Sequence, residues 1–227
     1  MQQEVYKYRL KLTKFGELKF ISHLDWQNLI IKTLRRCGLR LVLTEGFNKT
    51  PKMGFSPALP IFIESECELV YFQIFEKIPS NFKELFEQNT NSNVKLLEII
   101  DLSHILGRLE PLDTLIQWAK YTAKPLLNKN ESILNFEKMI YNMENCLSSD
   151  EILIEKKTKK GINKVINYRN SLNSMEFDGE KFSFILKAGQ SADIPSLRAD
   201  EFLKTLFGDS MFEIKRICFF DKDLKVL

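Results

Sequence analysis

Apolar and polar residues alternate along residues 4–13, the first patterned segment of the chain. Bulky side chains occupy alternate positions: Tyr6, Tyr8, Leu10 and Leu12. The positions between them are basic: Lys7, Arg9 and Lys11. Because successive side chains of a strand point to opposite faces, the pattern predicts a half-buried strand with a basic outer face.

A helical repeat follows, beginning at Ser22 and ending before Gly38. Its apolar residues recur at helical spacing: Leu24, Leu29, Ile30, Ile31 and Leu34. Ser22 with Asp25 three residues later is close to a capping box, and Gly38 suits a helix C-terminus. Basic residues fill the last turn, where they complement the helix dipole: Lys32, Arg35 and Arg36.

The remaining patterned segments of the first half complete a β-α-β-β-α-β order. We expect strands over 39–45, 66–77 and 94–101, and a short helix from Pro79 to about Gln88. This order is the ferredoxin-like signature. Its two crossovers place both helices on one face of the sheet and leave the other face open to a partner.

The second half repeats this order less regularly. Strands are expected over 114–123, 151–158, 181–188 and 211–220, and helices over 131–147 and 195–207. The sequence therefore predicts an α+β fold of tandem ferredoxin-like domains with antiparallel sheets, residues 1–103 and 104–227. The second domain is the more divergent and carries a basic insertion, residues 159–175.

The connection expected between the second and third strands, residues 46–63, is longer than a hairpin requires. Aromatic and basic or polar residues are interleaved in it: Phe47, Asn48, Lys49, Lys52 and Phe55. Aromatic rings stack on unpaired bases and lysines contact phosphates, so this composition suits single-stranded nucleic acid. The alternative is a packed connector whose phenylalanines fill the core.

Composition and charge narrow the class of protein. Hydrophobic residues form 44% of the 227 residues, which excludes a disordered or fibrous chain. No run reaches the ~18 apolar residues of a membrane span, and the N-terminus lacks a signal-peptide pattern, so we expect a cytoplasmic protein without a membrane partner. Residues 1–60 hold 11 Lys and Arg against 4 Asp and Glu, which suggests an anionic partner, nucleic acid first; solvated surface lysines are an equally good explanation of the charge.

Cysteine and histidine are too sparse for the common metal sites. Four cysteines form no CxxC pair and the two histidines are His23 and His104, so the usual zinc and iron–sulfur patterns are excluded. Walker A, GxGxxG, GxSxG and HExxH motifs do not occur. We expect no cofactor and no metal. His23, in the first helical turn, could contact a phosphate, act as a general acid or base, or simply lie on the surface.

Residues 8–75 resemble the radical SAM-linked protein family, which is catalogued as a domain of unknown function. The matching motifs are KxGxL from Lys14, SHLD from Ser22, RRxG from Arg35, GFN from Gly46, and PK at Pro51. Members occur as separate chains or fused C-terminal to radical SAM proteins. Two positions depart from the family pattern, Lys19 in place of Arg and Lys49 in place of Pro.

The resemblance implies association with a radical SAM enzyme, and such enzymes often modify RNA. This chain lacks the CxxxCxxC cluster motif and would not hold that cofactor itself. We therefore expect a non-catalytic RNA-binding or substrate-presenting module in RNA modification or processing. The expected RNA contacts are Lys7, Arg9, Lys11, Ser22, His23, Arg35, Arg36, Phe47, Asn48, Lys49, Lys52 and Phe55.

Two other functions stay open. Tandem ferredoxin-like domains are similar to those of CRISPR repeat-processing RNases, which would make this a metal-independent endoribonuclease with His23 as the catalytic acid or base. That argument rests on fold analogy. The third reading is an adaptor that binds protein only.

Overall fold

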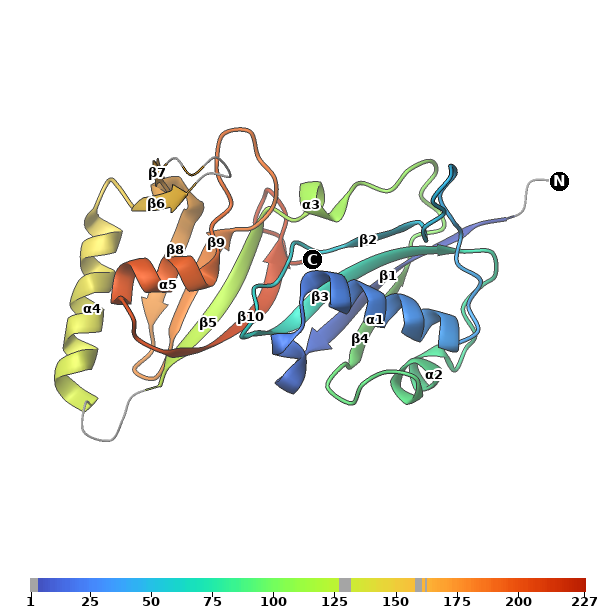
Figure 1. Cartoon of the computed structure of the whole chain (residues 1–227), viewed down its shortest axis with the longest axis horizontal. Helices are drawn as coiled ribbons and strands as arrows, with labels where there is room; N and C mark the ends of the chain where they lie inside the picture. Colours follow the sequence, from blue (N-terminus) through green and yellow to red (C-terminus); the bar gives the residue numbers. More distant parts are fainter. Residues whose placement is uncertain (1–3, 127–131, 158–160, 162) are drawn as a thin grey trace. The chain divides into compact units, whose positions relative to one another are not determined.

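A computed structural model describes residues 4–126, 132–157, 161 and 163–227 (Figure 1). The chain divides into two compact units, Met1–Leu115 and Ile116–Leu227. Each unit combines helices with antiparallel strands, which confirms the predicted α+β class. No helix within the described residues is long and apolar enough to cross a membrane.

The first unit is built on a sheet whose central strands are β1 (Tyr6–Lys14) and β3 (Ile63–Ile74). Strand β4 (Leu96–Asp101) pairs with β1, and the short β2 (Met53–Phe55) pairs with β3. The strand order is β4-β1-β3-β2, with each neighbouring pair antiparallel. Helices α1 (His23–Arg36) and α2 (Phe82–Gln88) lie on one face of this sheet (Figure 1).

The core of the first unit lies between that face and the two helices. Its fully buried members from β1, α1, β3 and α2 are Leu10, Leu12, Trp26, Ile30, Leu34, Phe72, Ile74, Phe82 and Phe86. The alternation seen in the sequence of β1 is therefore an alternation of burial. Lys7, Arg9 and Lys11 fall on the opposite, open face, where they are half-buried.

Helix α1 begins where the capping pattern predicts. The Ser22 hydroxyl accepts a hydrogen bond from the Asp25 amide at 3.1 Å and donates one to the Asp25 carboxylate at 2.7 Å. The first of these bonds satisfies one of the unpaired backbone amides at the helix start. Gly38 follows the helix with a φ of 80°, a conformation that favours glycine.

The second strand of the first unit differs from the prediction. Residues 39–45 form only isolated bridges, Leu41 with Ile74 and Leu43 with Pro51, whereas β2 lies inside the segment expected to be a loop. Leu41 lies opposite Ile74 of β3, and Met53 of β2 lies opposite Phe72 of the same strand. Leu41 and β2 therefore pair with successive parts of β3. The strand position beside β3 is thus interrupted: the chain leaves this position after Val42 and returns to it at Met53.

The second unit contains a sheet of order β10-β5-β9-β8. Its strands are β5 (Trp118–Pro125), β8 (Leu172–Phe177), β9 (Phe182–Lys187) and β10 (Phe212–Phe220). Its helices are α4 (Ser132–Ser148) and α5 (Ala199–Phe207). Phe184 of β9 packs against Phe202 of α5, with ring centroids 5.3 Å apart.

The middle of this unit also differs from the prediction. The strand expected over 151–158 is β6 (Leu153–Lys157), which pairs with β7 (Asn163–Asn167) in a separate two-stranded sheet. The place beside β9 is taken by β8. Most of the predicted insertion 159–175 is therefore regular structure, although residues 159, 160 and 162 lie outside the described residues.

Candidate functional site

The interruption of the strand beside β3 produces a small hairpin whose tip carries the predicted aromatic and basic residues. Its base is held by backbone bonds, from the Thr44 amide to the Thr50 carbonyl at 2.7 Å and from the Lys52 amide to the Val42 carbonyl at 2.7 Å. We call residues 44–50 the excursion. Phe47 at its tip is fully exposed, with a relative exposure of 102%, so this ring does not fill the core.

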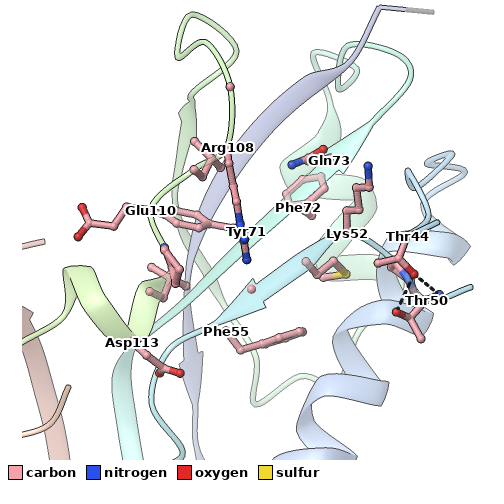
Figure 2. Close-up of a pocket in the computed structure, with 17 residues that line it drawn as sticks. Thr44, Thr50, Lys52, Phe55, Tyr71, Phe72, Gln73, Arg108, Glu110 and Asp113 are labelled. Atoms are coloured by element: carbon pink, nitrogen blue, oxygen red, sulfur yellow. Dashed lines mark hydrogen bonds between the residues drawn. The ribbon is translucent and has the colours of Figure 1, made fainter. Parts of the chain in front are cut away.

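A pocket of about 730 Å³ opens where the base of the excursion and β2 meet residues 107–113 (Figure 2). Its volume is in the range of small-molecule sites. Aromatic and apolar groups on its lining include Met53, Phe55, Tyr71, Phe72 and Leu112. Polar groups on its lining include Thr44, Thr50, Lys52, Gln73, Arg108, Glu110 and Asp113.

Gly54 leaves space for a ligand in the wall of the pocket formed by β2. It lies directly opposite Tyr71 in the antiparallel register and lines the pocket. A Cβ built at Gly54 would lie 3.8 Å from the Tyr71 Cβ, an ordinary contact, so a side chain would fit there and occupy pocket space. Glycine at this strand position leaves that space to a ligand.

The charged groups of the pocket are available for a ligand. In the part of the chain that the structure describes, the side chains of Lys52, Arg108 and Asp113 make no hydrogen bond or ion pair. Figure 2 shows Arg108 running alongside Tyr71 and Asp113 reaching toward Phe55, whereas Glu110 points away from the other labelled side chains. One guanidinium and one carboxylate therefore face a partly aromatic space.

Tyr71 is held from the open face of the sheet. Burial raises the pKa of its hydroxyl, and the neighbouring guanidinium of Arg9, which hydrogen-bonds to it, partly opposes this rise. The Arg9 Nε is itself buried and has no hydrogen-bond partner among the described residues. Below its pKa the Tyr71 side chain is a neutral phenol that can stack and donate a hydrogen bond.

Lys7 supports the opposite wall. Its Nζ donates to the carbonyl oxygens of Ile105 and Gly107, both at 2.6 Å, and Gly107 lines the pocket. Lys7 and Arg9, which the sequence marks as an outer basic face, therefore hold pocket-lining residues in place. Lys11 lies further along the same strand, opposite Leu69.

The other predicted contacts are divided between two places. Lys52 and Phe55 line the pocket, and Asn48 and Lys49 are exposed on the excursion with Phe47. The His23 ring packs edge-on against Phe55, with centroids 6.3 Å apart, so the start of α1 adjoins the pocket.

The end of α1 is not part of this site. Arg36 donates through Nε and Nη2 to the Asn89 carbonyl oxygen, at 3.0 and 2.6 Å, and so ties the helix to the residue after α2. Arg35 is exposed in the same turn. Neither arginine lines the pocket.

Sequence reasoning missed Tyr71, Gln73, Arg108 and Asp113. Tyr71 and Gln73 alternate with the buried Phe72 and Ile74, so the strand pattern could have predicted that they lie on the open face. Arg108 and Asp113 lie in a segment read only as a break between domains. No local pattern brings that segment to β2.

A second exposed surface lies beside the start of α1. Phe20 and Phe62 pack edge-on with centroids 5.6 Å apart, and Lys19 Nζ lies 5.5 Å from the centre of the Phe20 ring. Phe62 is 64% exposed and has a φ of 71°, which is rare for a bulky residue. Leu24 and Ile61 are also exposed.

Residues 7–198 match the profile of a protein family described as an uncharacterized protein conserved in bacteria (DUF2344). The match begins in β1 and ends just before α5. No curated protein matches the chain.

Proposed function

The chain belongs to the DUF2344 family, and from this premise we propose that it is a non-catalytic module that binds single-stranded RNA. The observation that carries the proposal is the pocket. Lys52 and Phe55, two residues that the sequence marks for RNA contact, line it together with Tyr71 and Arg108. Unpaired bases are commonly bound by stacking on aromatic rings and on arginine planes.

The size and surroundings of the pocket support a nucleotide ligand. A space of about 730 Å³ admits one nucleotide without requiring a groove for a duplex. The excursion, whose end residues Thr44 and Thr50 line the pocket, adds the exposed side chains of Phe47 and Lys49. A strand of RNA would place one base in the pocket and contact the excursion with neighbouring phosphates and bases.

The arrangement of elements supports a ferredoxin-like origin for both units. In the first, the order β1-α1-β2-β3-α2-β4 accompanies the strand order β4-β1-β3-β2. In the second, β5-α4-β8-β9-α5-β10 accompanies β10-β5-β9-β8, once the β6–β7 hairpin is set aside as an insertion. Antiparallel sheets of this kind leave one face open to ligands.

The proposed partner is a radical SAM enzyme, to which this chain would present its RNA. The support is the resemblance of residues 8–75 to the radical SAM-linked family. Within the described residues, no group of three or more His, Cys, Asp or Glu side chains is placed to hold a metal ion. Co-purification of a radical SAM protein with the tagged chain, retained after nuclease treatment, is the expected result.

Neutralising Lys49 of the excursion and Lys52 of the pocket tests RNA binding directly. We expect Lys49→Gln with Lys52→Gln to weaken binding of a labelled single-stranded RNA and to make log K fall less steeply with log salt. Two phosphate contacts correspond to a slope change of about 1.4 for a single strand. The measurement is fluorescence anisotropy across a salt series in the presence of EDTA.

The matched control is Lys32→Gln with Lys83→Gln, two exposed lysines on α1 and α2 that do not line the pocket. These changes remove the same total charge. If both double variants changed the slope equally, binding would depend on net charge and not on this site. If the wild-type chain bound no RNA near physiological salt, the protein-only adaptor would replace the present proposal.

One contact favours the nuclease as a second candidate, namely the packing of His23 on the pocket residue Phe55. In that case the RNA recovered from the binding assay would be cleaved, and His23→Ala would abolish cleavage while leaving affinity within a few fold. Intact RNA after prolonged incubation would eliminate this candidate.

A further inference from the structure

The pocket combines the groups that distinguish guanine from the other bases. The guanidinium of Arg108 and the carboxylate of Asp113, which make no hydrogen bond or ion pair within the described residues, come from one short segment of the pocket lining. Asp113 is half-buried and reaches toward Phe55, while Arg108 lies beside Tyr71 (Figure 2). This pairing of one multidentate donor with one multidentate acceptor is more specific than a basic pocket for phosphate alone.

The hydrogen-bonding edges of the bases decide which ligand such a pair prefers. Guanine offers two acceptors, O6 and N7, which arginine commonly contacts in a bidentate manner. Its Watson–Crick edge also offers two adjacent donors, the N1 and N2 hydrogens, which a carboxylate can accept together. Adenine, cytosine and uracil offer neither of these paired sets.

Resting on the proposed RNA-binding function, we propose that the pocket selects a guanine nucleotide within the bound strand. Arg108 contacts O6 and N7, and Asp113 accepts from N1 and N2. The half-buried Tyr71 ring, whose hydroxyl is hydrogen-bonded to Arg9, provides a stacking surface. Lys52, on the other side of the pocket, contacts a phosphate (Figure 2).

The proposal also gives Gly54 a role. A base stacked near Tyr71 must approach β2 closely, and Gly54 is the residue opposite Tyr71 in that strand. A Cβ at Gly54 would contact Tyr71 at an ordinary 3.8 Å, so the strand accommodates the first atom of a side chain, and we expect the remaining atoms of a larger one to fill the base site. Gly54→Leu is therefore a blocking variant with little expected effect on folding.

The experiment compares nine-nucleotide RNAs that differ at the central position only. We expect U4GU4 to bind at least about tenfold more tightly than U9, U4AU4 or U4CU4, since one good bidentate contact alone gives about this discrimination and the proposal has two. Inosine, which lacks the N2 amino group, and 7-deazaguanosine, which lacks the N7 acceptor, are each expected to lose most of that gain. These ligand changes need no alteration of the protein.

Variants then assign the preference to residues. Asp113→Asn is expected to abolish the difference in affinity between the guanosine and inosine RNAs. Arg108→Gln is expected to abolish the difference between guanosine and 7-deazaguanosine. Gly54→Leu should remove the guanine preference entirely. Glu84→Gln, an exposed carboxylate on α2, is the matched control and should behave as the wild type.

The outcomes separate this inference from the function on which it rests. Equal binding of all four bases, with U9 bound, would overturn guanine selection and leave the RNA-binding proposal standing. A guanine preference that survived both Asp113→Asn and Gly54→Leu would place base recognition elsewhere. Failure to bind any of the RNAs at about 150 mM salt would overturn both.

Discussion

Lys7 and Arg9 illustrate how a basic residue can serve a site without touching the ligand. The Lys7 Nζ donates hydrogen bonds to the carbonyl oxygens of Ile105 and Gly107, and Arg9 hydrogen-bonds to Tyr71. Both side chains lie on the open face of β1 and reach residues on the pocket lining. Substituting them would act on RNA binding through the position of those residues, so they are positioning residues.

Tyr71 makes the stability of the fold sensitive to alkaline pH. Burial raises the pKa of its hydroxyl above the ordinary value of 10.0, so as pH rises the unfolded chain loses this proton first. The folded state then binds more protons than the unfolded state, and the free energy of unfolding falls above about pH 10. We expect Tyr71→Phe to lose less stability than the wild type between pH 8 and 11.

Urea denaturation at the two pH values measures this difference. Tyr6 and Tyr8 also have raised pKa values, so the variant should retain part of the alkaline loss. Tyr141→Phe, an exposed tyrosine on α4, is the control. An identical pH dependence in the wild type and Tyr71→Phe would show that Tyr71 is not the residue responsible.

Among the elements, α1 has the clearest role, because its first turn adjoins the pocket through His23 and Phe55. Its start depends on Ser22, which accepts from the Asp25 amide and donates to the Asp25 carboxylate. The cap therefore fixes the point at which the helix begins. Fraying of this turn would release the His23 ring from Phe55.

Removing the cap should destabilise the protein measurably. Ser22→Ala is expected to lower the free energy of unfolding by about 1 kcal/mol, the usual effect of losing an N-cap hydroxyl. Ser22→Asp, which keeps an acceptor, should retain most of the stability. Ser174→Ala, at an exposed position of β8, is the control. Urea midpoints that were equal for Ser22→Ala and this control would contradict the capping role.

The elements that the sequence predicted are those with strong periodicity. The alternation in β1 extends over several residue pairs, and the apolar stripe of α1 extends over several helical turns. In both elements most positions with apolar residues in the sequence are buried or half-buried. Met53–Phe55 is too short for alternation to register, and Pro51 and Pro57 on either side resemble loop signals. Strand β8 lies within a basic stretch, which concealed its buried residues Leu172 and Met175.

The site was predictable to a similar extent. Composition drew attention to Lys52 and Phe55 because aromatic and basic residues alternate there, and both line the pocket. Arg108 and Asp113 reach the same pocket only through the path of the chain after β4. The approach of this segment to β2 depends on tertiary structure and produces no periodic pattern of residues in the sequence.

At the scale of the whole molecule, the segment after β4 determines where the first compact unit ends. We predicted a division between residues 103 and 104, and this division remains a prediction about independently folding domains. The compact units divide after Leu115, which keeps α3 (Leu112–Leu115) with the first unit. Residues 107–113 supply part of the pocket lining, so a fragment that ends at residue 103 would lack this wall.

Two fragments test where the first unit ends. We expect residues 1–115 to fold cooperatively and to bind single-stranded RNA within a few fold of the whole chain. Residues 1–103 should bind more than tenfold less tightly, because Arg108 and Asp113 are missing. Circular dichroism melts and anisotropy titrations of both fragments measure this. Equal affinities would show that residues 104–115 do not contribute to binding.

The interrupted strand beside β3 is also a place where the chain tolerates change in length. Leu41 and Met53 each keep their own partner on β3, Ile74 and Phe72, whatever the chain does between them. Extra residues at Asn48 would lengthen the tip without shifting either anchor. Relatives could therefore diverge in recognition by altering this tip alone, and a fluorophore or a short foreign peptide could be grafted at Asn48 while the sheet register stays intact.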